Sequence, residues 1–133
     1  MVSQKKQIIL DKSTHTLIEI NPPIIKMEVK EGDFIEVADI EKIHETNLSL
    51  SNQEPFCVLL DTSQGHFNVS PEANKLLASY AYAKTRMAAA IIVKTLATKL
   101  AGNFFIRFNK PPTPTKVFTN EEEALVWLRR YAK

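Results

Sequence analysis

Cysteine and glycine are scarce in this sequence of 133 residues, which has one cysteine and three glycines. A single cysteine, Cys57, excludes an internal disulfide framework and any metal site built from several cysteines. The glycines at 32, 65 and 102 are too far apart to form the phosphate-binding loops of nucleotide enzymes, which need closely spaced glycines between a strand and a helix. We therefore expect no nucleotide chemistry of the usual kinds and no cofactor.

Long hydrophobic runs and an excess of one charge are also missing. The longest apolar run, residues 87–93, has seven residues, whereas a helix that spans a membrane needs about 20. Residues 1–10 contain only the short apolar run Ile8-Ile9-Leu10, and a signal peptide needs roughly 7–15 apolar residues. With 17 basic and 15 acidic side chains, the net charge of +2 gives no strong attraction to nucleic acid or anionic lipid. We expect a cytoplasmic protein with no membrane span and no nucleic-acid partner.

The patterning that is present is that of one globular α/β domain. Hydrophobic residues make up 44% and charged residues 24% of the chain, as in ordinary globular proteins, and the length suits a single domain over residues 1–133. Apolar and charged residues alternate over 25–29, which is typical of a strand with one exposed face. The β-branched segment 16–20 and the turn residues 21–23 come before it, so we expect an antiparallel hairpin.

After the hairpin, helical and extended patterns alternate along the chain. Apolar residues at helical spacing predict about four helices, and apolar runs predict three further strands. The helices are expected near residues 36–45, 70–81, 95–108 and 119–131, and the strands at 56–60, 87–93 and 116–118. The run at 56–60 lacks polar alternation, which favours a central strand covered on both faces. This order predicts an α/β fold with a single mixed, mostly parallel β-sheet.

The element order and the last third of the chain point to a known family. The segments 102–112, 114–118 and 121–124, with Trp127-Leu128, resemble the C-terminal third of a family of small uncharacterised bacterial SpoIIAA-like, or STAS-like, proteins. A hairpin followed by alternating helices and strands is also similar to the STAS fold of bacterial anti-sigma factor antagonists. The resemblance implies that fold and a non-enzymatic regulatory or protein-interaction module.

Ser70 is a candidate regulatory residue. When Asp61 is aligned with the aspartate that ends the central strand of the phosphorylated antagonists, Ser70 falls at their phosphoserine, so the resemblance makes it a phosphorylation candidate. The surrounding motif differs, because Val69 replaces an acid and Pro71-Glu72 replaces Ser-Gly. The residues themselves predict a helix N-cap at Ser70, since proline is favoured at the first helical position and an acid in the first turn.

Asp61, Ser63 and His66 include the side-chain types of a hydrolase triad. All three lie within the loop 61–66, and no Gly-x-Ser-x-Gly elbow surrounds Ser63. The favoured interpretation is a polar loop between a strand and a helix, and a small hydrolase is the remote alternative.

The remaining histidines and the cysteine give no metal site. His15, His44 and His66 show no metal-ligand spacing. His44 follows the apolar Ile43 and is expected at the surface or at its boundary, and Cys57 is expected to be a small buried hydrophobe.

The helix expected at 95–108 carries a wide apolar stripe. Its members include Leu100, Phe104, Phe105 and Phe108. Such a stripe is typical of a helix buried between the sheet and its neighbours. It also fits a dimer face, or one wall of a pocket for an apolar ligand, and a related fold that binds lipids keeps the pocket interpretation open.

Two functional hypotheses of different classes follow. The first is a non-enzymatic STAS-like module that binds a protein partner, or itself as a homodimer, through the 61–72 loop and the helix at 95–108. Asp61, Ser63 and His66 would belong to that surface. The second hypothesis is a carrier of a small apolar or lipid-like ligand.

Overall fold

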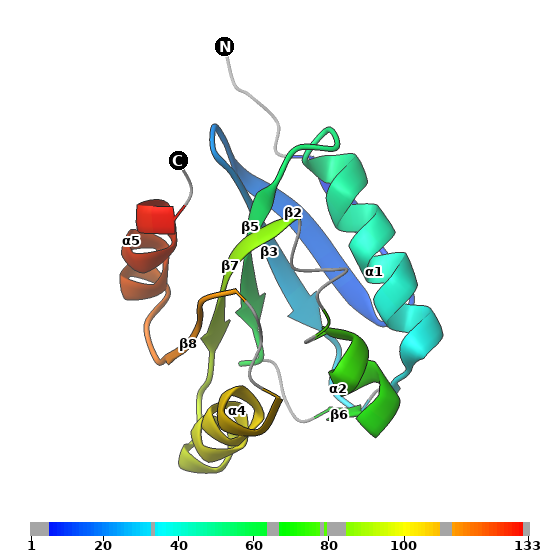
Figure 1. Cartoon of the computed structure of the whole chain (residues 1–133), viewed down its shortest axis with the longest axis vertical. Coiled ribbons are helices and arrows are strands. Elements are labelled where there is room, and N and C mark those ends of the chain that lie inside the picture. Colours follow the sequence, from blue (N-terminus) through cyan, green and yellow to red (C-terminus); the bar gives the residue numbers. More distant parts are fainter. Residues whose placement is uncertain are drawn as a thin grey trace.

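A six-stranded sheet forms the centre of the fold (Figure 1). The computed structural model describes residues 6–32, 34–63, 67–77, 79, 85–109 and 113–131, and of residues 98, 105, 108 and 109 it describes the backbone alone. In spatial order the strands are β1 (Gln7–Ile9), β2 (Ser13–Ile20), β3 (Pro23–Val29), β5 (Phe56–Asp61), β7 (Arg86–Ile92) and β8 (Thr115–Phe118).

The sheet combines antiparallel and parallel pairing. β1 pairs with β2 and β2 with β3 in antiparallel fashion, whereas β3, β5, β7 and β8 pair with one another in parallel. This confirms the predicted hairpin and the mixed, mostly parallel sheet. The sequence does not predict β1, because a strand of three residues shows little periodicity of its own and depends on its pairing with β2.

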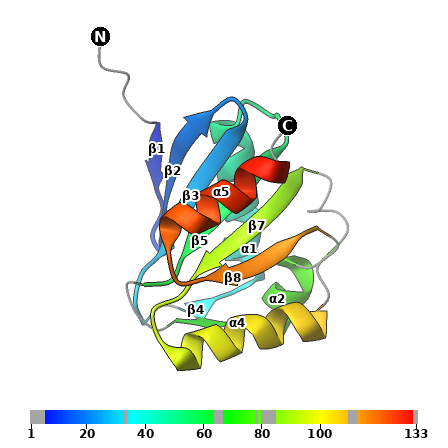
Figure 2. The ribbon, with the colours of Figure 1, turned by 90° about the vertical axis from the view of Figure 1, so that its left-hand side faces the viewer.

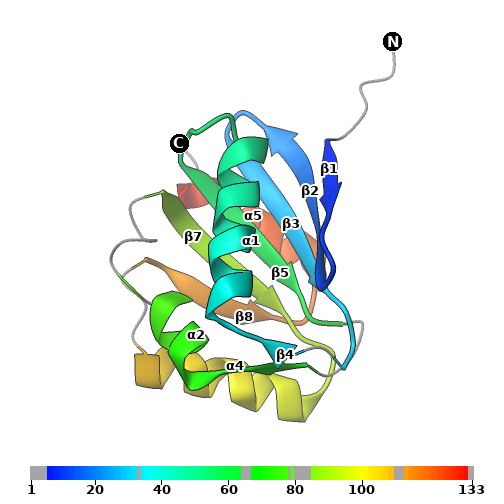
Figure 3. The same cartoon turned by 90° about the vertical axis from the view of Figure 1, so that its right-hand side faces the viewer.

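Four helices within the described residues cover the sheet from both sides (Figure 1). α1 (Val37–Leu50) and α2 (Pro71–Leu77) lie on one face, which Figure 3 shows from the front. α5 (Glu121–Tyr131) lies on the opposite face, as Figure 2 shows. α4 (Leu96–Asn109) runs below β8 and contacts it (Figure 2). We refer to the two sides of the sheet as the α1 face and the α5 face.

α1 extends beyond its predicted end near residue 45. Its buried residues Ile40, Ile43, Asn47 and Leu50 continue one helical stripe to the last turn. The polar Asn47 conceals this stripe in the sequence, because the residue is buried through a hydrogen bond to His15 and not through apolar character.

A second sheet of two short strands brings the starts of two helices together. β4 (Phe34–Ile35) pairs in parallel with β6 (Asn68–Val69) immediately before α1 and α2. The backbone N–H of Ser70 extends this pairing by donating to the Ile35 carbonyl at 2.9 Å. Strands of two residues leave no periodic signal, so the sequence does not predict this sheet.

β5 is covered on both faces, as its unbroken apolar run predicts. Cys57 and Leu59 belong to the core that α5 closes. Phe56 and Val58 belong to the core that also contains Leu50 of α1. The central strand is thus shared by two cores.

β7 changes its side-chain direction near its start. A register shift between β5 and β7 pairs Phe56 with Arg86 and Cys57 with Ala88, which leaves Met87 as an extra residue. Met87 packs with Ala88 against the α5 core. Arg86 is therefore directed to the α1 face together with Ala89, and both line the same cavity.

Candidate functional site

A cavity of about 130 Å³ lies between the α1 face of the sheet and the helices α1 and α2. Its walls are mainly apolar and come from the strands β3 to β8 and from the helices α1 and α2. Representative lining residues are Met27, Ile40, Val58, Leu60, Leu77 and Ile91. Pockets of this kind, apolar with a few polar groups, are the usual form of small-molecule sites in proteins.

Small side chains on β7 and β8 explain why the cavity exists. Ala89, at the middle of β7, offers only a methyl group to the α1 face, and its neighbour in the sheet is Thr115 of β8. The next lining residue on β7, Ile91, has a larger side chain. The same alanine-rich strand that permits close packing on the α5 face therefore leaves volume on the α1 face.

Arg86 brings a positive charge to this cavity. Its Nη2 donates a hydrogen bond to the Leu77 carbonyl at the end of α2, at 2.7 Å. Its Nε is buried and has no hydrogen-bond partner in the part of the chain that the structure describes. Within the described residues no carboxylate pairs with Arg86, and burial lowers the pKa of its guanidinium.

Two residues of α1, His44 and Asn47, also line the cavity. The His44 Nε2 lies 3.5 Å from the Thr85 hydroxyl, and its ring is 6.3 Å from that of Phe56. Burial, and then the nearby charge of Arg86, lower the pKa of His44 below its ordinary value of 6.5. His44 is therefore neutral at neutral pH, and Arg86 provides the positive charge.

Asn47 connects the cavity wall to a buried hydrogen-bond network. His15 is fully buried on β2; its Nδ1 lies 2.8 Å from Asn47 Oδ1, and its Nε2 lies 2.8 Å from the Ser13 hydroxyl. Because an amide oxygen only accepts, the His15 proton belongs on Nδ1, and the Ser13 hydroxyl donates to Nε2. Burial lowers the pKa of His15, against the opposing effect of the Asn47 hydrogen bond, so the neutral ring is retained.

The sequence did not point to this site. Arg86 directly precedes the apolar run at 87–93, and nothing in the adjacent residues marks it as part of a site. His44 was expected at the surface or at its boundary. The signal that would find Arg86 is the register shift between β5 and β7, which depends on strand pairing and not on local sequence.

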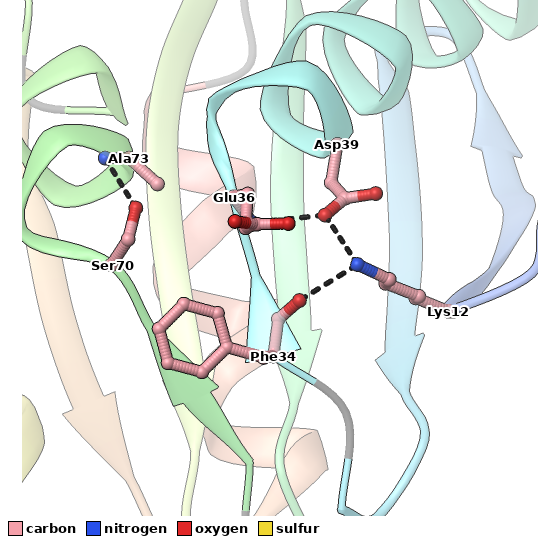
Figure 4. A network of polar contacts seen from close by, with 6 residues as sticks. All are labelled: Lys12, Phe34, Glu36, Asp39, Ser70 and Ala73. Atoms are coloured by element: carbon pink, nitrogen blue, oxygen red, sulfur yellow. Dashed lines mark hydrogen bonds and ion pairs between the residues drawn. The ribbon is translucent and has the colours of Figure 1, made fainter.

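Ser70, the phosphorylation candidate, serves as the N-cap of α2 (Figure 4). Its hydroxyl oxygen accepts a hydrogen bond from the Ala73 N–H at 3.1 Å, and the residue is buried. The local prediction of a helix cap is confirmed by this contact. The corresponding start of α1 is held by Asp39, whose carboxylate accepts from the Glu36 N–H at 2.9 Å and pairs with Lys12 at 2.7 Å (Figure 4).

The loop that follows β5 places Asp61 in a structural role. Its Oδ1 accepts a hydrogen bond from the Ser63 N–H at 2.9 Å. Its Oδ2 lies 3.7 Å from the Lys26 amine, which also pairs with Glu121 of α5 at 2.9 Å. His66, the third candidate of this loop, lies outside the described residues. Asp61 thus contacts the backbone of Ser63, and this hydrogen bond shapes the loop.

The candidate partner helix exposes part of its apolar stripe. Leu100 is 61% exposed and Phe104 is 60% exposed, and Leu96 is exposed beside them. Neither Leu100 nor Phe104 lines the cavity, whose described walls come from other elements. Of Phe105 and Phe108 the structure describes the backbone alone.

Two further observations concern metal binding and membrane spans. The described residues contain no group of three histidine, cysteine or acidic side chains that could hold a metal ion. Among the described helices, none has both the length and the apolar character to cross a membrane.

Comparison with solved structures defines the class of fold. A crystal structure of an uncharacterized protein of the DUF3478 family from Shewanella loihica PV-4, which has a SpoIIAA-like fold, matches this chain with a TM-score of 0.58. The match covers 96% of this chain and 98% of the other, at 17% sequence identity. This confirms the SpoIIAA-like fold expected from the sequence.

The sequence itself identifies the family. Residues 18–132 match the model of a domain of unknown function, DUF7793, and the chain belongs to this family. No curated protein matches the sequence. The function has therefore to be argued from the site.

Proposed function

We propose that this protein is a non-enzymatic binding module that holds a small, mainly apolar ligand in the cavity on the α1 face. The observation that carries the proposal is the cavity of about 130 Å³, with mainly apolar walls. In another protein, an apolar cavity of about 150 Å³ takes up benzene. The proposal develops the carrier hypothesis, with the ligand under α1 and not against α4.

Two features support a role without catalysis. The Asp61 carboxylate fixes the loop after β5, since its Oδ1 accepts a hydrogen bond from the Ser63 N–H and its Oδ2 lies near the Lys26 amine. The SpoIIAA-like fold is consistent with this role.

The test is an NMR titration of the ¹⁵N-labelled protein with toluene, an apolar ligand of suitable size. We expect saturable shifts of the amides of Val58, Leu60 and Ala89, which surround the cavity. Replacing Ala89→Leu would fill the space and abolish the shifts, whereas the matched change Ala97→Leu on the exposed surface of α4 would leave them unchanged. An absence of saturable shifts in the unmodified protein would overturn the proposal.

A second function, binding of a protein partner or of another copy, is supported by the exposed stripe of α4. Leu96, Leu100 and Phe104 present apolar surface at the end of the sheet. Sedimentation velocity over a range of concentrations tests self-association directly. We expect a concentration-dependent mass that Leu100→Glu removes, and a single monomer mass at all concentrations would exclude the homodimer.

A further inference from the structure

We infer that the ligand of this cavity carries a carboxylate group, which accepts a hydrogen bond from the Nε–H of Arg86. The inference rests on the proposed binding function of the cavity and names the chemical class of its ligand. Three features of the cavity wall carry it. The Nε–H of Arg86 has no partner among the described residues, no described carboxylate balances its charge, and its guanidinium has the shape that matches a carboxylate.

The vacant donor is the Nε–H of Arg86. The great majority of buried polar side-chain atoms in proteins have a hydrogen-bond partner, and this one has none among the described residues. In the described residues, two other buried side-chain atoms lack partners, Ser79 Oγ and Thr113 Oγ1. Of these three residues, Arg86 is the one that lines the cavity.

The unbalanced charge is that of the same guanidinium. Among the described residues that line the cavity, Arg86 is the one that carries a full charge at neutral pH, and no carboxylate lies among them. Burying an unpaired charge costs free energy that a bound anion would recover. A ligand with one negative charge balances one arginine, whereas a phosphate dianion would bring an excess charge into an apolar cavity.

The geometry of the donor also favours a carboxylate. The planar guanidinium offers five N–H groups in a fixed arrangement that matches the two oxygens of a carboxylate. One of these groups is occupied by the Leu77 carbonyl. Asn47, which also lines the cavity, has its oxygen hydrogen-bonded to His15 and carries two N–H donors. A carboxylate, which only accepts, suits these donors.

The experiment compares two probes of nearly equal shape, isovalerate and its neutral amide, isovaleramide. Binding is followed by NMR titration of the complete chain. We expect isovalerate to bind at the cavity more tightly than the amide. The Arg86→Met variant should weaken isovalerate binding by roughly 10- to 100-fold, the range that follows from the net contribution of a charge-assisted hydrogen bond. The same variant should leave the affinity for the amide and for toluene nearly unchanged.

The control variant is Arg107→Met, which removes one positive charge from the exposed surface of α4. It should leave isovalerate binding intact, so a loss in both variants would mean long-range attraction and overturn the inference. Equal binding of the two probes, with no effect of Arg86→Met, would also overturn it while the proposed function stands. If toluene too fails to bind, the proposed function itself fails.

Thermal unfolding separates a binding role of Arg86 from a structural one. Because the Nε of Arg86 is buried without a partner among the described residues, a binding role predicts that Arg86→Met keeps or raises the Tm while it weakens isovalerate binding. A role limited to fixing the end of α2 through the Leu77 carbonyl predicts a lower Tm with unchanged discrimination between the probes. Arg86→Lys keeps the charge without the fork and should bind isovalerate less tightly than the unmodified protein.

Discussion

The two faces of the sheet use the same strands and differ in how completely they are filled. On the α5 face, Ala88 and Ala90 of β7 lie in one core with Ala124 and Leu128 of α5, and all four are fully buried. On the α1 face, Ala89 borders a cavity of about 130 Å³ together with the unpaired Arg86. An alanine packs tightly where a helix approaches it, and it leaves space where the covering helix lies over other strands.

The comparison separates a structural face from a candidate binding face. The α5 face has an apolar core that continues into the ring contacts of Trp127 with Phe118 and Tyr131, and its charged groups Lys26, Asp61 and Glu121 are paired with one another. The α1 face holds both described histidines, the buried Asn47 and the guanidinium of Arg86. His15 and Asn47 satisfy each other, whereas the Arg86 Nε has no partner among the described residues and is the group that a ligand would complete.

The largest expected effect compares two neighbouring leucines of β5. Leu59 is fully buried on the α5 face, so Leu59→Ala should lower the free energy of unfolding by about 2–5 kcal/mol. Leu60 is partly exposed and lines the cavity, so Leu60→Ala should cost clearly less. Urea denaturation of both variants measures the difference. Equal losses would mean that the α1 face is as tightly packed as the α5 face.

The next effect concerns added volume at neighbouring positions of β7. Ala88 is fully buried on the α5 face, and Ala88→Leu should destabilise the protein by about 1–3 kcal/mol or more through overpacking. Ala89→Leu enters existing space and should be neutral or stabilising by up to about 2 kcal/mol. Opposite signs of the two changes support the comparison, and similar destabilisation by both would contradict it.

A pH effect should arise from the α1 face. Burial lowers the pKa of both His15 and His44 below 6.5, so below that pH the unfolded chain binds more protons than the folded one. The histidine contribution to the free energy of unfolding should therefore be nearly constant well above pH 6.5 and fall as the pH drops through about 6.5 and below. Urea denaturation at about pH 7.5 and about pH 5.5 measures this loss. The loss should be smaller in His15→Gln, and an unchanged loss would remove His15 from the explanation.

The smallest effect is chemical and leaves stability unchanged. Burial raises the pKa of Cys57 to about 11, against a smaller opposing effect of a hydrogen bond with the Ala88 backbone. The folded protein should therefore react very slowly with iodoacetamide at about pH 8. A cysteine placed by Ala89→Cys in a Cys57→Ala background should react faster, because position 89 is partly exposed. Faster labelling at Cys57 would show that the α5 face opens more readily.

Local signals in the sequence predict a large part of this fold. The cap at Ser70, the alternation in β3 and the unbroken run of β5 are written in adjacent residues, and the structure confirms the elements they predict. The short strands β1, β4 and β6 depend on partners distant in sequence, so no local pattern reveals them. Arg86 escapes detection for a related reason, because one extra residue in β7 decides which face its side chain reaches.

A crystal structure of the protein grown with isovalerate tests the central claim most directly. The account predicts that the ligand occupies the cavity on the α1 face, with a carboxylate oxygen about 3 Å from the Nε of Arg86 and the branched chain against Val58 and Leu60. A ligand bound elsewhere, or one in the cavity whose carboxylate points away from Arg86, would contradict it.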